Sequence, residues 1–141
     1  MERSGASRMT TITRLLDLAH EMGVHLQHHD NGPLGWYSRS LRTISTRRGL
    51  SVWDYKAALA HELGHAYYGD SMTACGHRHT RQERRADLYA AELLIDRTRL
   101  VDLALWHKQD THGLAIDLEV TPDLLELYLD TYPLHLTGET A

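Results

Sequence analysis

The stretch that most constrains the fold is His61-Glu62-Leu63-Gly64-His65, which reads H-E-x-x-H. It lies in a segment that predicts a helix over residues 51–69, because a serine N-cap opens the segment, no proline interrupts it and a glycine ends it. Residues four apart share one face of a helix, so His61 and His65 can direct two imidazoles at one metal ion. Glu62 lies one residue round the helix, where it can reach a water on that metal without ligating the metal.

The motif is not decisive by itself, because the chain has 11 histidines and five residues can match by chance. A catalytic zinc ion has three protein ligands, so a third ligand is needed. In the pattern H-E-x-x-H-x-x-G-x-x-H the third ligand is a histidine, but Tyr68 and Ser71 occupy the glycine and histidine positions here. That version of the site is excluded.

A second predicted helix, over residues 80–95, supplies the other common solution, a glutamate. Glu83 lies 18 residues after His65, which leaves room for a loop and an antiparallel return. Asp87 follows on the same face as Glu83, where it can accept the free N–H of a ligating histidine and fix its tautomer. Two alternatives remain: Thr80-x-x-Glu83 is also a capping box, and Glu92, on a different face more than two turns further along, is a second candidate ligand.

These two segments resemble the ImmA/IrrE family of zinc-dependent metallopeptidases, in particular its stand-alone members from phages and mobile elements. The family pairs H-E-x-x-H with a later E-x-x-A-(N/D)-x-(F/Y)-A-x-x-L-L, and this chain has Glu83-x-x-Ala-Asp-x-Tyr-Ala-Ala-Glu-Leu-Leu94. The resemblance covers about residues 12 to 100. It implies that His61, His65 and Glu83 bind one Zn²⁺ and that Glu62 is the general base of a gluzincin-like metalloendopeptidase. Ile95-Asp96 departs from the Met-Pro that commonly follows the leucine pair.

Composition is that of an ordinary globular protein, with 141 residues, 42% hydrophobic residues and a net charge of −4. The acidic balance argues against nucleic acid as the main partner, and no apolar run is long enough to cross a membrane. The N-terminus lacks the apolar core of a signal peptide, and Cys75 is the only cysteine, which excludes an internal disulfide. We therefore expect a cytoplasmic protein.

Along the chain the patterns predict an α+β fold, in which a small sheet of about three strands packs on a helical bundle. The H-E-x-x-H helix is central to this zincin-like layout. We expect residues 1–9 to be a disordered lead and residues 10–141 to be a single domain, with a zinc-binding core over 10–95 and a C-terminal helical part over 96–134. The expected elements are a helix over 10–23, strands over 24–29, 36–39 and 42–46, helices over 51–69, 80–95 and 96–107, and a final pair of helices after residue 113. An edge strand beside the metal site can pair with an extended peptide, and the sequence leaves open which strand forms that edge.

The connection over residues 70–79 contains Cys75, His77 and His79, and a solvated polar loop is the simplest interpretation of all three. His79 and Tyr68 are candidate residues for stabilising a transition state. In the first strand, alternation places His25 and His29 with Gln27 on a solvated face, which is a simpler interpretation of His25, His28 and His29 than metal binding. Arg78, Arg81, Arg84 and Arg85 form a basic patch, which is either a solvated helix face or a surface that steers an acidic substrate.

The C-terminal part reads as a short helix, a turn at Glu119-Val120 and a second helix capped by Thr121 with Pro122 at its first position. This unit resembles the helix-turn-helix-like end of many family members. Its second helix carries three acidic residues and no lysine or arginine, and such a helix repels phosphates. We therefore predict that it packs against the core or contacts a protein partner instead of reading DNA.

The resemblance implies that a helix-turn-helix transcriptional regulator or phage-type repressor is the substrate, so that cleavage releases the genes it represses. Two alternatives remain. A non-cleaving, zinc-containing anti-repressor or toxin–antitoxin-type protein would only bind its target, although such a structural site has no need of the base Glu62. A peptidase of broad specificity suits neither the cytoplasm nor a domain of this size.

Overall fold

The structure, a computed structural model, describes residues 11–72, 78–107 and 110–135. Cys75, His77 and the expected disordered lead over residues 1–9 lie outside the described residues. The elements are α2 (Thr11–Glu21), β1 (His25–His29), β2 (Gly35–Ser38), β3 (Thr43–Arg47), α3 (Val52–Tyr68), α4 (Thr80–Leu94), α5 (Arg97–His107), α6 (Thr111–Leu118) and α7 (Pro122–Thr131). The predicted α+β class, with a three-stranded sheet packed on helices, is confirmed.

The sheet has the order β1-β3-β2, with β1 parallel and β2 antiparallel to β3. Ile44 in β3 is opposite Leu26 in β1 and Tyr37 in β2. β3 is therefore the central strand, and β1 and β2 are the edges. Because α3 packs against β2 as well as β3, β2 is the edge strand beside the H-E-x-x-H helix.

Local signals in the sequence set both ends of α3. The Ser51 side chain accepts a hydrogen bond from the Asp54 amide at 3.1 Å, and Gly69 ends the helix in the left-handed conformation with φ of 67°. Leu59 and Leu63 of this helix are fully buried. The helix thus carries its two histidines through the interior of the protein.

The helices α3 and α4 cross closely, which positions the second half of the site. A Cβ atom built on Gly64 would lie 3.0 Å from Cα and 3.1 Å from the carbonyl oxygen of Ala86. The glycine in H-E-x-x-H therefore permits the approach of α4. The first turn of α4 is capped by His79 and Gln82, so the alternative in which Thr80 and Glu83 form a capping box is wrong.

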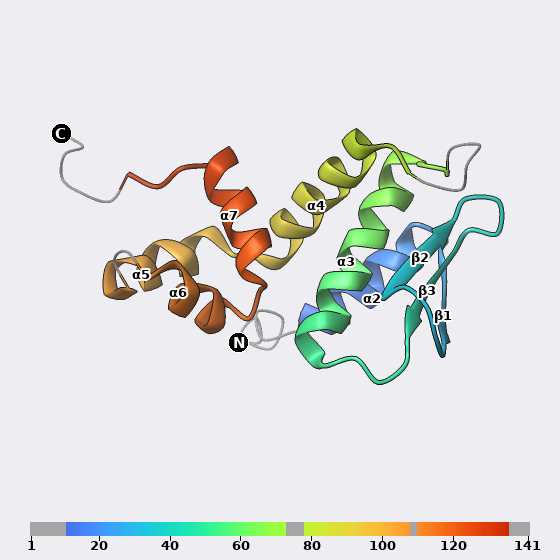
Figure 1. Ribbon diagram of the computed structural model, residues 1–141, viewed down its shortest axis with the longest axis horizontal. Helices are drawn as coiled ribbons and strands as arrows, with labels where there is room; N and C mark the ends of the chain where they lie inside the picture. The colour runs from blue at the N-terminus through green and yellow to red at the C-terminus, as the bar shows by residue number, and fades with distance from the viewer. Residues whose placement is uncertain (1–10, 73–77, 108–109, 136–141) are drawn as a thin grey trace, which may run out of the picture.

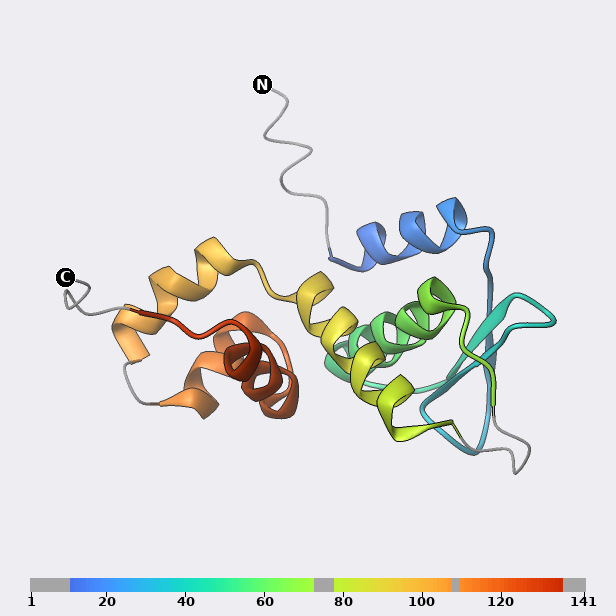
Figure 2. The same ribbon diagram turned by 90° about the horizontal axis from the view of Figure 1, so that it is seen from above.

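The C-terminal helices α5, α6 and α7 lie on the side of α4 away from the sheet (Figures 1 and 2). Thr121 caps α7 as predicted, with its hydroxyl accepting from the Leu124 amide at 3.2 Å, and Pro122 is the first helical residue. The buried Lys56 of α3 forms an ion pair at 3.0 Å with Glu119 in the turn before α7. Within the described residues, no helix combines the length and the apolar character needed to cross a membrane.

One cluster of buried apolar residues extends through both the sheet side and the C-terminal helices. Leu15, Ile44 and Leu63 belong to it on the sheet side, and Leu100 and Leu125 belong to it among the last helices. α7 packs directly on α4. The position of α7 is consequently fixed relative to the helices that carry the candidate site.

Candidate metal centre

The two histidines of α3 converge, as their spacing predicts. The Nε2 atoms of His61 and His65 are 3.1 Å apart, and the rings meet edge to face with their centroids separated by 4.7 Å. His65 is completely buried and His61 is partly exposed. The pair therefore faces a space that solvent can enter from the His61 side.

Glu83 of α4 reaches both imidazoles. Its Oε1 lies 3.1 Å from Nε2 of His61, and its Oε2 lies 2.9 Å from Nε2 of His65. These three side chains form a group whose candidate ligand atoms all lie within 4.8 Å of one another. Glu92, the alternative ligand, lies away from this group and accepts a hydrogen bond from the Tyr132 hydroxyl.

Both imidazoles are held from behind by carboxylates. Nδ1 of His61 is 2.7 Å from Asp87, as predicted, and Nδ1 of His65 is 2.9 Å from the buried Asp70. A proton on each Nδ1 leaves both Nε2 lone pairs directed at each other and at the Glu83 carboxylate. Three electron-rich groups in contact, with no hydrogen between them, call for a cation. Two imidazole nitrogens and a carboxylate are a donor set that suits zinc.

The two histidines differ in how readily they accept a proton. Burial is the main cause that lowers the pKa of His65, and the hydrogen bond to Asp70 opposes it only in part. Burial also acts to lower the pKa of His61. There the hydrogen bond to Asp87 and the charges of the neighbouring carboxylates outweigh burial and raise the pKa. The lowered pKa favours neutral His65, which is the form that binds a metal. The raised pKa of His61 means that this ring needs a higher pH to lose its proton and become a ligand.

Glu62 is buried beside this group and is held by an arginine. Nη1 of Arg78 lies 3.2 Å from Oε1 of Glu62, and Nη2 of Arg78 donates to the carbonyl oxygen of Tyr37 at 2.6 Å. Arg78 thus links the candidate base to the edge strand β2. The strand also approaches Glu62 directly, because a Cβ built on Gly35 would lie 3.2 Å from Cγ of Glu62.

The predicted basic patch is wrong for two of its four arginines. The Arg78 side chain is only 9% exposed and binds Glu62. Arg85 donates to Asp70 at 2.6 Å and stacks over the ring of Tyr68 at 4.2 Å. Only Arg81 and Arg84 are exposed as expected.

Sequence reasoning missed the roles of two site residues. It gave Asp70 no role and named Arg78 only as part of a basic patch. Asp70 directly follows the glycine that ends α3, and its amide bonds the carbonyl of His65 at 2.9 Å, so this turn folds the carboxylate back under the ring. The signal in the sequence that could have identified Asp70 is its position directly after the glycine that ends the H-E-x-x-H helix. No comparable signal marks Arg78.

The other candidate residues lie elsewhere. Tyr68 is exposed on α3, where it packs with Tyr67 and Tyr89. His79 caps α4 through its ring nitrogen, which accepts from the Arg81 amide at 3.1 Å. Neither Tyr68 nor His79 is among the described residues that line the hollow beside His61.

In β1, the ring nitrogen Nδ1 of His28 lies 3.0 Å from the Thr46 hydroxyl, and Nδ1 of His29 lies 2.6 Å from the Ser45 hydroxyl. Both rings are therefore tied to the central strand β3, and their strand lies on the far edge of the sheet from β2.

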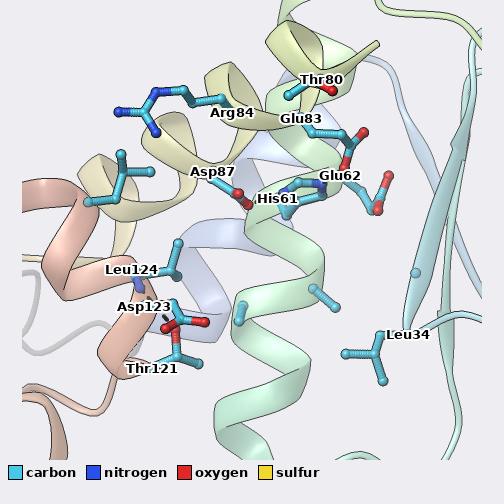
Figure 3. A pocket seen from close by; sticks show the side chains of 14 residues that line it. Leu34, His61, Glu62, Thr80, Glu83, Arg84, Asp87, Thr121, Asp123 and Leu124 are labelled. Carbon is cyan, nitrogen blue, oxygen red and sulfur yellow. Dashed lines mark hydrogen bonds and ion pairs between the residues drawn. The ribbon is translucent and has the colours of Figure 1, made fainter. Parts of the chain in front are cut away.

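The hollow beside the metal-binding group has a volume of about 660 Å³. Figure 3 shows His61, Glu62 and Glu83 at one end of it, with Thr121, Asp123 and Leu124 of α7 on one side and Leu34 on the other. An extended ligand in this hollow would pass between the edge strand β2 and α7, directly beside the candidate base.

The fold and the site together define an α+β protein in which two crossed helices gather two histidines and a glutamate beside a buried carboxylate. The chain belongs to the family of IrrE N-terminal-like domains, a family of peptidases, whose model matches residues 37–129. The predicted family is thereby confirmed. The match runs from β2 to α7 and includes every residue of the candidate site except Leu34 and Gly35 at the rim of the hollow. Family membership suggests a metallopeptidase.

Among solved structures, the chain is similar to a Mycobacterium tuberculosis transcriptional regulator, with a TM-score of 0.61 and 17% sequence identity. The likeness covers 92% of this chain and 45% of that chain, so this chain spans less than half the length of the regulator. At this identity the likeness shows the fold alone. Among the curated proteins, none matches this chain.

Proposed function

We propose that this chain is a zinc-dependent metalloendopeptidase that cleaves a cytoplasmic helix-turn-helix transcriptional regulator or phage-type repressor. The observation that carries the proposal is the convergence of His61, His65 and Glu83 beside the buried Glu62. Membership of a peptidase family supports the hydrolytic chemistry. The regulatory role is supported by the occurrence of the same fold in a transcriptional regulator.

His61, His65 and Glu83 would hold the zinc ion, with Asp87 and Asp70 orienting the two imidazoles. Zinc at this position supplies a Lewis acid that polarises a carbonyl and lowers the pKa of water. Glu62 takes a proton from the attacking water as its oxygen adds to the scissile carbonyl carbon. Glu62 then delivers that proton to the amide nitrogen as the C–N bond breaks, so that water is divided between the two products.

Arg78 fixes the carboxylate that does this work. It donates to Oε1 of Glu62, and no other described residue bonds Oε2, the atom proposed for the proton transfer. Its second contact, to the carbonyl oxygen of Tyr37, ties the carboxylate to the strand along which an extended substrate would lie.

The first test is the substitution Glu62→Gln, which keeps the shape of the side chain and removes its basicity. We expect the variant to retain one equivalent of zinc and to lose cleavage by 10²- to 10⁴-fold, on the order of what a positioned general base contributes. Mass spectrometry of native protein purified without chelator would check the metal. Normal cleavage by the variant would show that the base is assigned wrongly.

The substrate is tested by comparing quantitative proteomes of cells that express the native protein or Glu62→Gln, in a host that carries the neighbouring genes. Depletion or clipping of one DNA-binding regulator only with the native protein would support regulatory proteolysis. The alternative is a non-cleaving anti-repressor or toxin–antitoxin-type binding protein. It would win if both versions leave every protein intact and derepress the same genes.

A further inference from the structure

The C-terminal helices contribute a wall to the candidate active site. Leu124 and Leu127 of α7 line the hollow on one side, and Leu34 lines it on the other. Between them α3 presents two small side chains, Ala57 and Ala58, one turn before His61. The hollow thus has apolar walls, a floor with no large side chain, and an end at His61 and Glu62.

We propose that α7 selects the substrate: the hollow receives an apolar side chain of the peptide beside the scissile bond, and Asp123 favours a basic residue next to it. This proposal rests on the proposed peptidase function. It assigns to the C-terminal helices a role in recognising the substrate, which is more specific than packing.

The volume supports an apolar occupant. A hollow of about 660 Å³ lies within the range of sites that bury most of a ligand, and the apolar residues in it are contributed by three separate elements. Because the side chains of Ala57 and Ala58 are small, they leave space in the hollow, and a leucine-sized side chain can enter it without displacing a protein side chain. Burial of such a side chain favours binding by about tenfold or more relative to glycine.

Charge supports a basic neighbour. Glu83 and Asp87 contact the imidazoles, and Glu62 pairs with Arg78, so these carboxylates are engaged. The Asp123 carboxylate is exposed and has no hydrogen-bond or ion-pair partner among the described residues. Figure 3 shows it at the edge of the hollow beside Thr121. Arg84 also lines the hollow, but it extends away from His61 on the outer side of α4 (Figure 3).

The wall is held in place by the buried residues of α7 that adjoin it. Leu125 is fully buried, Tyr128 is buried, and α7 packs along α4. The turn before α7 is tied to α3 by the ion pair of Lys56 with Glu119. A wall fixed in this way can discriminate between side chains, because a mismatch is not relieved by movement of α7.

The test measures binding of three fluorescein-labelled decapeptides to the zinc-loaded Glu62→Gln protein by fluorescence anisotropy, so that turnover does not interfere. The central pair of residues is Leu-Lys, Leu-Glu or Gly-Lys in an otherwise constant glycine- and serine-rich sequence. We expect Leu-Lys to bind about tenfold more tightly than Gly-Lys because of side-chain burial. We expect it to bind several-fold more tightly than Leu-Glu because of the charge at Asp123.

Variants then assign the preference to the wall. Ala57→Leu fills the floor and should abolish the advantage of Leu-Lys over Gly-Lys, and Leu127→Gln should reduce it without adding bulk. Asp123→Lys should reverse the order of Leu-Lys and Leu-Glu. The matched control is Asp130→Lys, which makes the same charge change on α7 away from the hollow and should leave the order intact. Thermal unfolding confirms that each variant is folded.

The inference is overturned if the three peptides bind equally, if none binds, or if Ala57→Leu and Asp123→Lys leave the order unchanged. A failure of the peptidase proposal has a different signature. In that case the peptides are discriminated and the variants act as expected, but the native protein with zinc leaves every peptide intact.

Discussion

His61 and His65 are supported by carboxylates in different environments, and the difference has measurable consequences. Asp70 is buried and bonds both His65 and Arg85, whereas the Asp87 side chain is about half exposed. Asp70→Asn and Asp87→Asn should each lower zinc affinity by about 10- to 100-fold, because the ring is no longer held in the metal-binding tautomer. Asp70→Asn should also lower the free energy of unfolding, since it leaves Arg85 without its charged partner.

Competition of the protein with a fluorescent chelator for zinc measures the affinity. The exposed Asp102→Asn is the control, and native affinity in both site variants would contradict the assignment.

Arg78 should matter for turnover and not for the metal. Arg78→Lys keeps the charge, but an ammonium group lacks the planar fork that bonds Glu62 and the Tyr37 carbonyl together. We expect kcat to fall on the order of tenfold, because the base is less well positioned, with zinc content unchanged. The exposed Arg81→Lys should behave as the native protein does. Equal kcat for Arg78→Lys and Arg81→Lys would show that the ion pair has no part in the reaction.

Sequence reasoning succeeded at the residues that a repeating pattern positions. The i, i+4 spacing predicted that His61 and His65 converge, and the four-residue step from Glu83 predicted that Asp87 reaches the same site. It could not position Asp70 or Arg78, because their side chains depend on the path of the chain between α3 and α4. A loop path is set by tertiary packing, and no periodicity in the sequence encodes it.

At the scale of elements, the crossing of α3 and α4 sets the geometry of the site. Helix propensity alone predicts that Gly64→Ala stabilises α3 by about 1 kcal/mol. The close contact with Ala86 predicts the opposite sign, a loss of about 1–3 kcal/mol from overpacking. Zinc affinity should fall as well, because α4 carries Glu83. Urea denaturation and zinc titration measure the two effects.

Ala86→Gly provides a second check on this crossing. The two atoms nearest to the added methyl group belong to the Ala86 backbone, so removing the Ala86 side chain should not restore stability to Gly64→Ala. Full rescue, or stabilisation by Gly64→Ala alone, would show that the helices separate at little cost.

The boundaries of elements were predicted well where one residue type determines them and less well elsewhere. Gly69 and the Thr121-Pro122 pair end α3 and begin α7 as expected. α4 begins at Thr80 as predicted, but its N-cap was missed, because a histidine ring nitrogen takes the capping role that usually falls to serine, threonine, asparagine or aspartate. The order of the strands was open in the sequence. Only the packing of α3 on β2 and β3 decides that β2 is the edge beside Glu62.

At the scale of the whole molecule, the C-terminal helices contribute to the site region, a position that the sequence did not predict for the helical part over residues 96–134. The acidic residues of α7 predicted packing or a protein partner instead of DNA reading, but they gave no indication of what the helix faces. Asp123 lines the hollow because α7 packs on α4, a contact between residues far apart in the chain. Such contacts depend on the complementarity of two surfaces, which a single sequence does not display.

Metal binding should couple the stability of the whole protein to pH. The raised pKa of His61 means that this ring keeps its proton to a higher pH than an ordinary histidine does, and the proton must leave before the metal binds. In the metal-free protein His61 contributes stability that is present below the unfolded pKa and is lost as pH rises through its folded pKa. His65, with its lowered pKa, contributes the opposite dependence, since stability falls as pH drops below 6.5 toward its folded pKa. Without metal the two effects act on opposite sides of pH 6.5, so that together they favour stability near that pH.

When the metal binds, both rings must be neutral, so protons compete directly with zinc. At a free zinc concentration of 100 times the Kd at pH 8, zinc should add about 3 kcal/mol to the free energy of unfolding and raise Tm by about 10 °C. At pH 6 and the same zinc concentration, the rise should be much smaller. Differential scanning calorimetry at both pH values, with and without zinc, measures the difference.

Asp87→Asn should weaken this pH dependence of the zinc-induced rise in Tm, since Asp87 forms the hydrogen bond that raises the pKa of His61. An equal zinc-induced rise at pH 6 and pH 8 in the native protein would show that His61 does not lose a proton on binding the metal.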